Sequence, residues 1–178
     1  IHSHTASLAS AGEVWAGMLR QVGVIPVDSG DEVVDTIAAL VNTPMSTKRD
    51  LALVAMTGGQ SVAITDQFER AGFNVPELSQ QSYDRLAEFF TVIGGSYRNP
   101  FDAASTVGRE EENLEKLLDI LADDDAINGG IAIELRTQRY DEDPKWLDAT
   151  LDLLDGYRER TGQPVIALAP TGGVMSAG

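Results

Sequence analysis

A continuous apolar run at residues 51–56 (LALVAM) constrains the fold of this 178-residue chain more than any other feature. A strand without polar alternation has to be covered on both faces, as happens in parallel sheets with helices on either side. The run leads directly into Thr57, Gly58 and Gly59, and helical spacing follows. The sequence therefore predicts a buried strand, a glycine turn and a helix that begins near Gln60.

The remaining sequence alternates helical and strand patterns. Apolar spacing predicts six helices. Four of them cover residues 14–22, 60–71, 110–123 and 146–160. The other two begin at a capping residue, one at 28 or 29 and running to 42, the other at 79 or 82 and running to 90. Further strands are predicted at residues 24–27, 127–135 and 164–169. This alternation predicts an α/β fold with a mostly parallel sheet and helices on both faces. Ligands of such sheets bind at the carboxyl ends of the strands, where the glycine turn lies.

Composition narrows the classes of partner. The formal net charge is -15, from 28 acidic and 13 basic residues, which disfavours nucleic acid and anionic membrane surfaces. The sequence has no apolar run near the roughly 18 residues of a membrane span and no export signal, so we expect no membrane partner and a cytoplasmic location. The absence of cysteine excludes thiol and disulfide chemistry. Because the chain opens at Ile1 and stops just past a strand-like run, we expect a piece of a longer protein.

The glycine turn has two interpretations. A helix entered through Gly58 and Gly59 exposes unpaired amides and the positive end of its dipole, and an anion such as a phosphoryl group can approach that bare backbone. Alternatively, the glycines only form a tight connection between strand and helix. The motif lacks the lysine of a P-loop and the third glycine of a dinucleotide fingerprint. Thr57 or Ser61 could add a hydroxyl in either case.

The second candidate is His4, within the small and polar residues 3–10. A neutral imidazole is nucleophilic near pH 7, and an uncrowded segment would let it travel between sites. A solvated tail with two incidental histidines is the alternative. His2 and His4 together supply only two metal ligands, so we expect no metal site.

Other polar residues give weaker signals. Residues 99–102 (NPFD) are typical of a turn, in which Asp102 is available to backbone amides or to a ligand. Arg98, Arg136 and Arg139 could contact an anion near the sheet edge, or simply be paired on the surface.

Four stretches taken in order carry a resemblance to a known family: SHTASLAS (3–10), RQVGVIPVDSGDEVVD (20–35), LALVAMTGGQSVAITDQFERAGFNVPELS (51–79) and RNPFDAAS (98–105). Together they resemble the NDP-forming acyl-CoA synthetases, which include the ADP-forming acetyl-CoA synthetases and are relatives of succinyl-CoA synthetase. The likeness covers nearly the whole chain. It is the ordered set that is specific, since each motif alone is weak.

The resemblance implies part of an acid-thiol ligase that makes acyl-CoA from a carboxylate, CoA and ATP through acyl phosphate and phosphohistidine. Residues 1–11 would end the preceding domain, with His4 as the catalytic phosphoryl carrier. Residues 12–178 would form a succinyl-CoA ligase-like domain with a flavodoxin-like three-layer fold. In it, Gly58, Gly59, Gln60 and Ser61 would bind the phosphate.

The same resemblance implies what is missing. We expect no cofactor bound to the fragment itself, whereas the complete enzyme would use ATP or ADP, Mg and CoA. Its partners would be CoA-binding and ATP-grasp domains, on the same chain or a second subunit, and a small carboxylic acid. The isolated fragment should be inactive, with residues 1–10 not docked on the glycine turn. Departures from the family are Ala6 and Ser10 in place of glycine, and Gln60 and Ser61 in place of Pro-Gly.

Two other functions stay open at this point. The chain could be a flavodoxin-like regulatory or binding domain of a synthetase-like protein, for example one fused to an acetyltransferase. A receiver-like signalling domain also suits the acidity and the fold, but the sequence lacks an obvious aspartate at a strand end with a partnering lysine.

Overall fold

The structure is a computed structural model that describes residues 12–44, 46–90, 96–103, 106–107, 111–135 and 144–169. The chain divides into two compact units, Ile1–Thr43 and Pro44–Gly178. Within the described ranges, no helix is both long and apolar enough to cross a membrane.

The larger unit is built on one parallel sheet. Its strands are β1 (Leu51–Ala55), β2 (Phe101–Asp102), β3 (Gly130–Glu134) and β4 (Val165–Leu168), in the order β2-β1-β3-β4. All three pairings are parallel, with Val54 opposite Phe101, for example. This order is that of the first four strands of a flavodoxin-like sheet. The predicted α/β class with a parallel sheet is confirmed.

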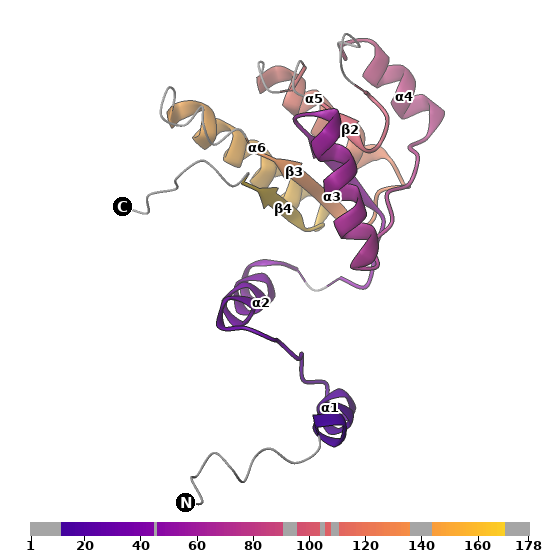
Figure 1. Ribbon diagram of the computed structural model, residues 1–178. Coiled ribbons are helices and arrows are strands. Elements are labelled where there is room, and N and C mark those ends of the chain that lie inside the picture. The colour runs from indigo at the N-terminus through magenta and orange to yellow at the C-terminus, as the bar shows by residue number, and fades with distance from the viewer. Residues whose placement is uncertain are drawn as a thin grey trace, which may run out of the picture. The chain divides into compact units, whose positions relative to one another are not determined.

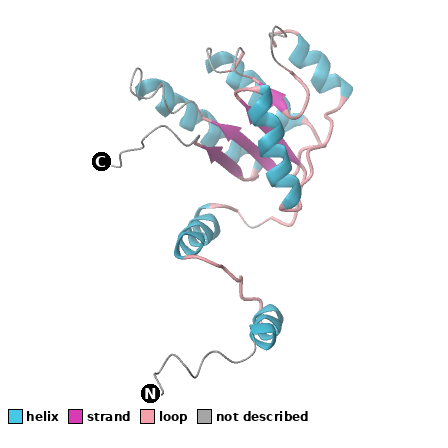
Figure 2. Ribbon diagram, viewed as in Figure 1, coloured by secondary structure: helices cyan, strands magenta, loops and turns pink. Residues whose placement is uncertain are grey.

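Helices cover both faces of this sheet (Figures 1 and 2). They are α3 (Gly58–Arg70), α4 (Gln80–Ala87), α5 (Glu111–Asp123) and α6 (Pro144–Thr161). In Figure 1, α3 lies on one face, and α5 and α6 lie together on the other. The chain moves across the sheet in one direction from β1 to β2, and in the opposite direction from β2 to β3 and then β4. Because crossovers between parallel strands are right-handed, connections that run in opposite directions place their helices on opposite faces.

The core forms where the sequence predicted continuous burial. Every residue of β1 is at most 1% exposed, which confirms that both of its faces are covered. The leucine stripe of α5 is also buried, with Leu117 and Leu121 fully inaccessible. These side chains pack in one apolar cluster with Phe101 of β2 and Tyr157 of α6.

The smaller unit contains α1 (Gly12–Gln21) and α2 (Gly30–Asn42). Ser29 caps α2, as predicted, and its hydroxyl accepts a hydrogen bond from the amide of Glu32 at 3.1 Å. The strand predicted at residues 24–27 is wrong, because this segment is an unpaired connection between the two helices. A strand needs a neighbouring strand for its backbone groups, and the described part of this unit offers none.

The predicted turn at residues 99–102 is partly wrong. Phe101 and Asp102 pair with Val54 and Ala55 as strand β2. Asn99 precedes them and is buried, where its side chain accepts from the Leu53 amide at 2.9 Å and donates to the Leu51 carbonyl at 2.9 Å. The sequence conceals this short strand because its partner is distant along the chain.

Asp124 joins the end of α5 to the start of α4. The residue is 5% exposed, and its carboxylate accepts from the amide of Ser79 at 2.9 Å, the hydroxyl of Ser79 at 2.8 Å and the amide of Ala126 at 2.9 Å. Burial acts to raise the pKa of Asp124, but hydrogen bonds from Ser82, Ala126 and Ser79 outweigh it and hold the pKa below its usual value. The charged carboxylate therefore stabilises the folded state.

We expect Asp124→Asn to lower the free energy of unfolding at pH 7 by about 1–3 kcal/mol, because an amide cannot accept all three hydrogen bonds. Because the pKa of Asp124 is lowered in the folded state, the charged carboxylate contributes fully to stability at pH values above the ordinary aspartate pKa of about 3.9. This contribution is lost as the pH falls through the lower, folded-state pKa. The difference from wild type should therefore shrink below about pH 4. Urea unfolding across pH measures it, with the exposed neighbour in Asp125→Asn as control. An equal loss in both variants would contradict the assignment.

Candidate functional site

The predicted glycine turn lies at the carboxyl end of β1. Helix α3 begins at Gly58, two residues before the position expected from spacing. Thr57 is the N-cap, in an extended conformation, and its hydroxyl oxygen accepts from the amide of Gln60 at 3.2 Å. The same hydroxyl donates to the Gln60 side-chain oxygen at 2.9 Å. Threonine and glutamine three residues apart thus satisfy one another at the helix start.

Two amides of this turn remain open. Gly58 and Gly59 are exposed, and their backbone N–H groups have no acceptor among the described residues. The first amides of a helix lack intrahelical partners and carry the positive end of its dipole. The turn therefore offers two free donors to solvent, at the sheet edge where ligands of such folds bind.

The other two predicted residues are Gln60 and Ser61, and both already form hydrogen bonds within the turn. Ser61 is only 7% exposed, and its hydroxyl donates to the carbonyl of Gly58 at 2.8 Å. The amide of Ser61 donates to the carbonyl of Thr57 at 2.9 Å, while Gln60 bonds with Thr57 as described. The predicted set of Gly58, Gly59, Gln60 and Ser61 lies together, but the open donors are those of the two glycines.

Carboxylates flank the turn from both neighbouring strands. Asp102 ends β2, and its Oδ2 lies 3.2 Å from the place where a Cβ on Gly58 would stand. Glu134 ends β3, is 4% exposed, and accepts from the amide of Met56 at 2.8 Å through Oε2. Neither carboxylate has an ion-pair partner among the described residues. The dipole of α3 favours an anion here, whereas these two charges oppose it.

Sequence reasoning missed Glu134 entirely, and it predicted Asp102 as a turn residue that is available to backbone amides or to a ligand. The available signal was an acidic residue that closes the otherwise apolar strand Gly130–Glu134. Its significance depends on the pairing of β3 with β1, which brings that strand end beside the glycine turn.

The remaining candidates are placed elsewhere or lie outside the described residues. His2, His4, Arg136 and Arg139 belong to the ranges that the structure does not describe. Arg98 pairs with Glu77 at 3.2 Å and lies over the ring of Tyr83, which favours the surface interpretation of this arginine. In the described part of the chain, no group of three or more potential metal ligands occurs.

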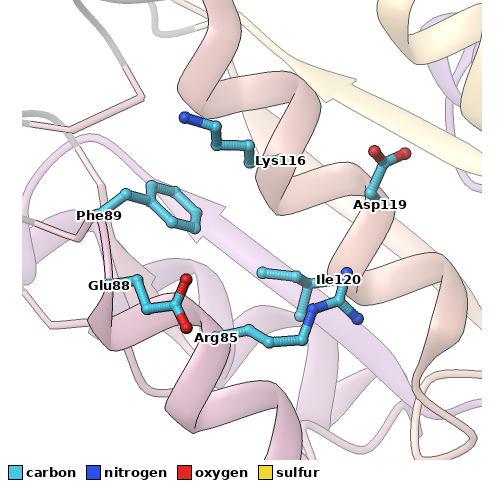
Figure 3. A pocket seen from close by; sticks show the side chains of 6 residues that line it. All are labelled: Arg85, Glu88, Phe89, Lys116, Asp119 and Ile120. Carbon is cyan, nitrogen blue, oxygen red and sulfur yellow. The ribbon is translucent and has the colours of Figure 1, made fainter.

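A separate pocket of about 220 Å³ lies between α4 and α5 (Figure 3). Phe89 and Ile120 supply apolar surface, and charged side chains surround them. Three of the four charged side chains that line it are already paired: Arg85 with Asp123 at 3.0 Å, Lys116 with Glu112 at 2.7 Å and Asp119 with Arg160 at 2.7 Å. The pocket is also smaller than the roughly 300–1,000 Å³ of ordinary small-molecule sites. The glycine turn is therefore the stronger candidate.

The fold and this turn define a parallel α/β domain with an open helix N-terminus at the carboxyl edge of its sheet. Proteins of similar sequence are ADP-forming CoA ligases. The ADP-forming 4-hydroxybutyrate–CoA ligase of Nitrosopumilus maritimus is 30% identical over 100 residues, which are 56% of this chain and 14% of the ligase. Subunit alpha of the ADP-forming acetate–CoA ligase II of Pyrococcus furiosus is 26% identical over 117 residues, 65% of this chain and 25% of the subunit.

A third sequence relative is also an ADP-forming ligase, and solved structures share the fold of this chain. The ADP-forming acetate–CoA ligase I of Archaeoglobus fulgidus is 28% identical over 139 residues, 78% of this chain and 20% of that ligase. A dinucleotide-forming acetyl-coenzyme A synthetase 1 of Ca. Korarchaeum cryptofilum matches with a TM-score of 0.72 and 15% identity, over 95% of this chain and 36% of that one. The same synthetase in complex with phosphate and ADP matches with a TM-score of 0.72 and 16% identity, over 96% of this chain and 36% of that one. No protein-family model matches the sequence.

The resemblance drawn from the four sequence stretches is thus confirmed, since the homologues of this chain are ADP-forming acyl-CoA ligases. The chain spans 14% to 25% of the length of these three relatives. It corresponds to only one part of such a ligase.

The two glycines should respond differently to alanine. A Cβ on Gly59 meets nothing within 4 Å, so Gly59→Ala should raise the free energy of unfolding by about 0.5–1 kcal/mol. A Cβ on Gly58 lies 3.2 Å from Oδ2 of Asp102, so we expect Gly58→Ala to be less stable than Gly59→Ala by about 1 kcal/mol. Urea unfolding measures both.

An Asp102→Ala background provides the control for this comparison. Removing the carboxylate opens the space beside residue 58, so the difference between the two alanine variants should then disappear. A difference that persists without Asp102 would show that the carboxylate does not require glycine at this position.

Proposed function

We propose that this chain is part of an NDP-forming acyl-CoA synthetase, which makes an acyl-CoA thioester from a carboxylate, CoA and ATP. The names of its sequence relatives support a CoA ligase that forms ADP. The observation that carries the proposal for this domain is the pair of free amides at Gly58 and Gly59, at the carboxyl edge of the sheet. In this proposal they hold the phosphoryl group while it is attached to His4.

The proposed reaction has three balanced steps. A ring nitrogen of His4 attacks the γ-phosphorus of ATP, and ADP leaves with the electrons of the broken P–O bond. A substrate carboxylate oxygen then attacks this phosphorus, which returns the imidazole and forms an acyl phosphate. Finally the CoA thiolate attacks the acyl carbon, and inorganic phosphate leaves. His4 is the nucleophile of the first step and the leaving group of the second.

Fixed amides suit a phosphoryl group that must be held and then released. The dipoles of Gly58 and Gly59 are oriented before the group arrives, so they need no reorganisation when charge develops. A lysine would hold the group more tightly, and the hydrogen bonds of this turn within the described ranges involve no lysine. The affinity is therefore expected to be moderate, which favours onward transfer.

The neighbouring carboxylates fit a phosphoryl group carried on imidazole better than free phosphate. Asp102 and Glu134 repel a bare dianion at this edge. The second ring nitrogen of a phosphohistidine carries N–H, a donor that a carboxylate accepts. The amides and carboxylates together thus match both ends of the proposed intermediate.

The metal and the other substrates are assigned elsewhere in the enzyme. No group of three or more potential metal ligands gathers in the described ranges. We therefore place the magnesium ion, nucleotide and CoA on the CoA-binding and ATP-grasp parts of the complete synthetase.

The nucleophile is tested by labelling the full-length protein with ATP that carries radioactive γ-phosphate. Wild type should acquire phosphate that is labile in acid and stable in alkali, as a phosphorus–nitrogen bond is. His4→Ala should abolish this label, while His2→Ala should retain it. Normal labelling of the His4→Ala protein would remove the central assignment.

The amide site is tested by placing a negatively charged side chain beside the two glycine amides. In the full-length protein, Gly59→Asp should lower phosphohistidine formation about tenfold or more, because a carboxylate near the phosphoryl group costs about 1–4 kcal/mol at a separation of about 4 Å. Gly59→Asn has the same shape without the charge and should lose much less. Acid at the first turn of a helix is stabilising, so unfolding measurements should show no loss of stability with Gly59→Asp. Equal labelling in both variants would exclude the glycine amides as the phosphoryl site.

A further inference from the structure

The amino ends of β1 and β3 meet at the edge of the sheet opposite the glycine turn. Leu51 pairs with Gly130 there, so Asp50 enters β1 beside the point where Asn128 and Gly129 lead into β3. These two residues form the one Asn-Gly pair of the sequence. An asparagine loses its amide most readily in such a pair, because glycine has no side chain that hinders the backbone from reaching the reactive conformation.

The fold requires glycine at position 129. A Cβ there would stand 2.8 Å from the amide nitrogen of Asp50 and 2.9 Å from the carbonyl carbon of Arg49, and neither backbone atom can swing aside. The amide of Gly129 donates to the carbonyl of Asp50 at 2.8 Å, and the amide of Asn128 donates to the same oxygen at 3.2 Å. Close approach of two backbones thus keeps a labile Asn-Gly pair in this chain.

Asp50 also holds the side chain of Asn128. Nδ2 of Asn128 donates to Oδ2 of Asp50 at 2.6 Å, and Oδ1 of Asn128 accepts from the amide of Asp50 at 3.4 Å. The other carboxylate oxygen of Asp50 accepts from Nδ2 of Asn74 at 2.8 Å. Hydrogen bonds from Asn74 and Asn128 hold the pKa of Asp50 below its usual value, so this group is charged at neutral pH. Asp50 forms no ion pair with the described residues.

These contacts oppose deamidation. In that reaction the backbone nitrogen of Gly129 loses its proton and attacks Cγ of Asn128. The new N–Cγ bond closes a succinimide ring, and the Cγ–Nδ2 bond breaks to release ammonia. Water then opens the ring to aspartate or to isoaspartate, in which the backbone runs through the former side chain. In the folded domain the attacking N–H is bound by the Asp50 carbonyl, and the leaving amide is bound by the Asp50 carboxylate.

We propose that Asn128 is a deamidation site that Asp50 keeps closed in the folded domain and that reacts when the amino ends of β1 and β3 separate. The product cannot return to the closed arrangement. An aspartate at this position would set its carboxylate against that of Asp50, with no cation between them. Isoaspartate would add a backbone carbon and displace the Gly129 amide from Asp50.

The consequence is a permanent record of local opening. Each conversion weakens the pairing of β1, the strand that carries the glycine turn at its other end. Deamidation at this edge is independent of the phosphoryl chemistry proposed for the opposite edge.

Peptide mapping by mass spectrometry tests the site, with full-length protein aged at mildly alkaline pH. Wild type should convert Asn128 at least about tenfold more slowly than a synthetic peptide of residues 124–133, because conversion waits for local opening. Asp50→Ala should speed the conversion about tenfold, as expected for the loss of one hydrogen bond to a charged group. Asn74→Ala is the matched control, since it removes the other amide from the same carboxylate and should leave the rate nearly unchanged.

A peptide-like rate in wild type, or no acceleration in Asp50→Ala, would overturn the proposal. Equal acceleration in Asp50→Ala and Asn74→Ala would also overturn it, because protection would then reflect general stability. If Asp50→Ala does not fold, wild type in urea below its unfolding transition decides. Conversion of Asn128 should then rise together with hydrogen exchange of the Gly129 amide, and conversion that stays constant while exchange rises would contradict the mechanism.

The exclusion of the product is tested with Asn128→Asp, which has the aspartate side chain. This variant should raise the ratio of unfolded to folded protein at least about tenfold at pH 7, because two like charges then meet at the edge. The double variant Asp50→Asn/Asn128→Asp exchanges the two groups, so an amide again donates to a carboxylate while residue 50 still accepts from Asn74. It should recover most of the wild-type stability. A single variant as stable as wild type, or a double variant no more stable than the single one, would show that the product fits the closed arrangement.

Discussion

Parallel pairing of β1 with both β2 and β3 is the interaction on which the larger unit depends. It places β1 between two strands and beneath helices on both faces, which explains why its residues are at most 1% exposed. The same pairing makes three neighbouring strands end at one edge. Thr57, Asp102 and Glu134 are far apart in sequence and meet there only for this reason. A register shift of one residue would exchange Phe101 with Asp102 between core and edge.

The electrostatics of this edge are mixed rather than simply positive. Two free amides and the dipole of α3 attract an anion, and two carboxylates limit how strongly it is held. Such a balance suits a group that arrives covalently attached to a carrier and leaves again. Tethering makes binding intramolecular, so a modest intrinsic affinity is enough for high occupancy. The proposed phosphohistidine provides this arrangement, with the carrier eight residues before α1.

The two units differ in what stabilises them. The larger unit buries a cluster that includes Leu86, Phe101 and Tyr157 and can pack its helices on its own sheet. The smaller unit buries none of its described side chains, although its helices have clear apolar stripes. Apolar patches of this kind are typical of surfaces that are covered in the complete protein.

The sequence by itself determined the features that depend on neighbouring residues: the buried strand at 51–55, the glycine turn, a helix cap at residue 28 or 29 and the helix over residues 111–123. Each arises from local spacing or from a side chain that bonds its own backbone. Only the tertiary structure decided that Phe101 and Asp102 form a strand, that residues 24–27 do not, and that Glu134 lies at the turn. Strand pairing joins residues separated by up to 79 positions, such as Leu51 and Gly130. No local pattern records which distant backbone completes a strand or which strand ends share an edge.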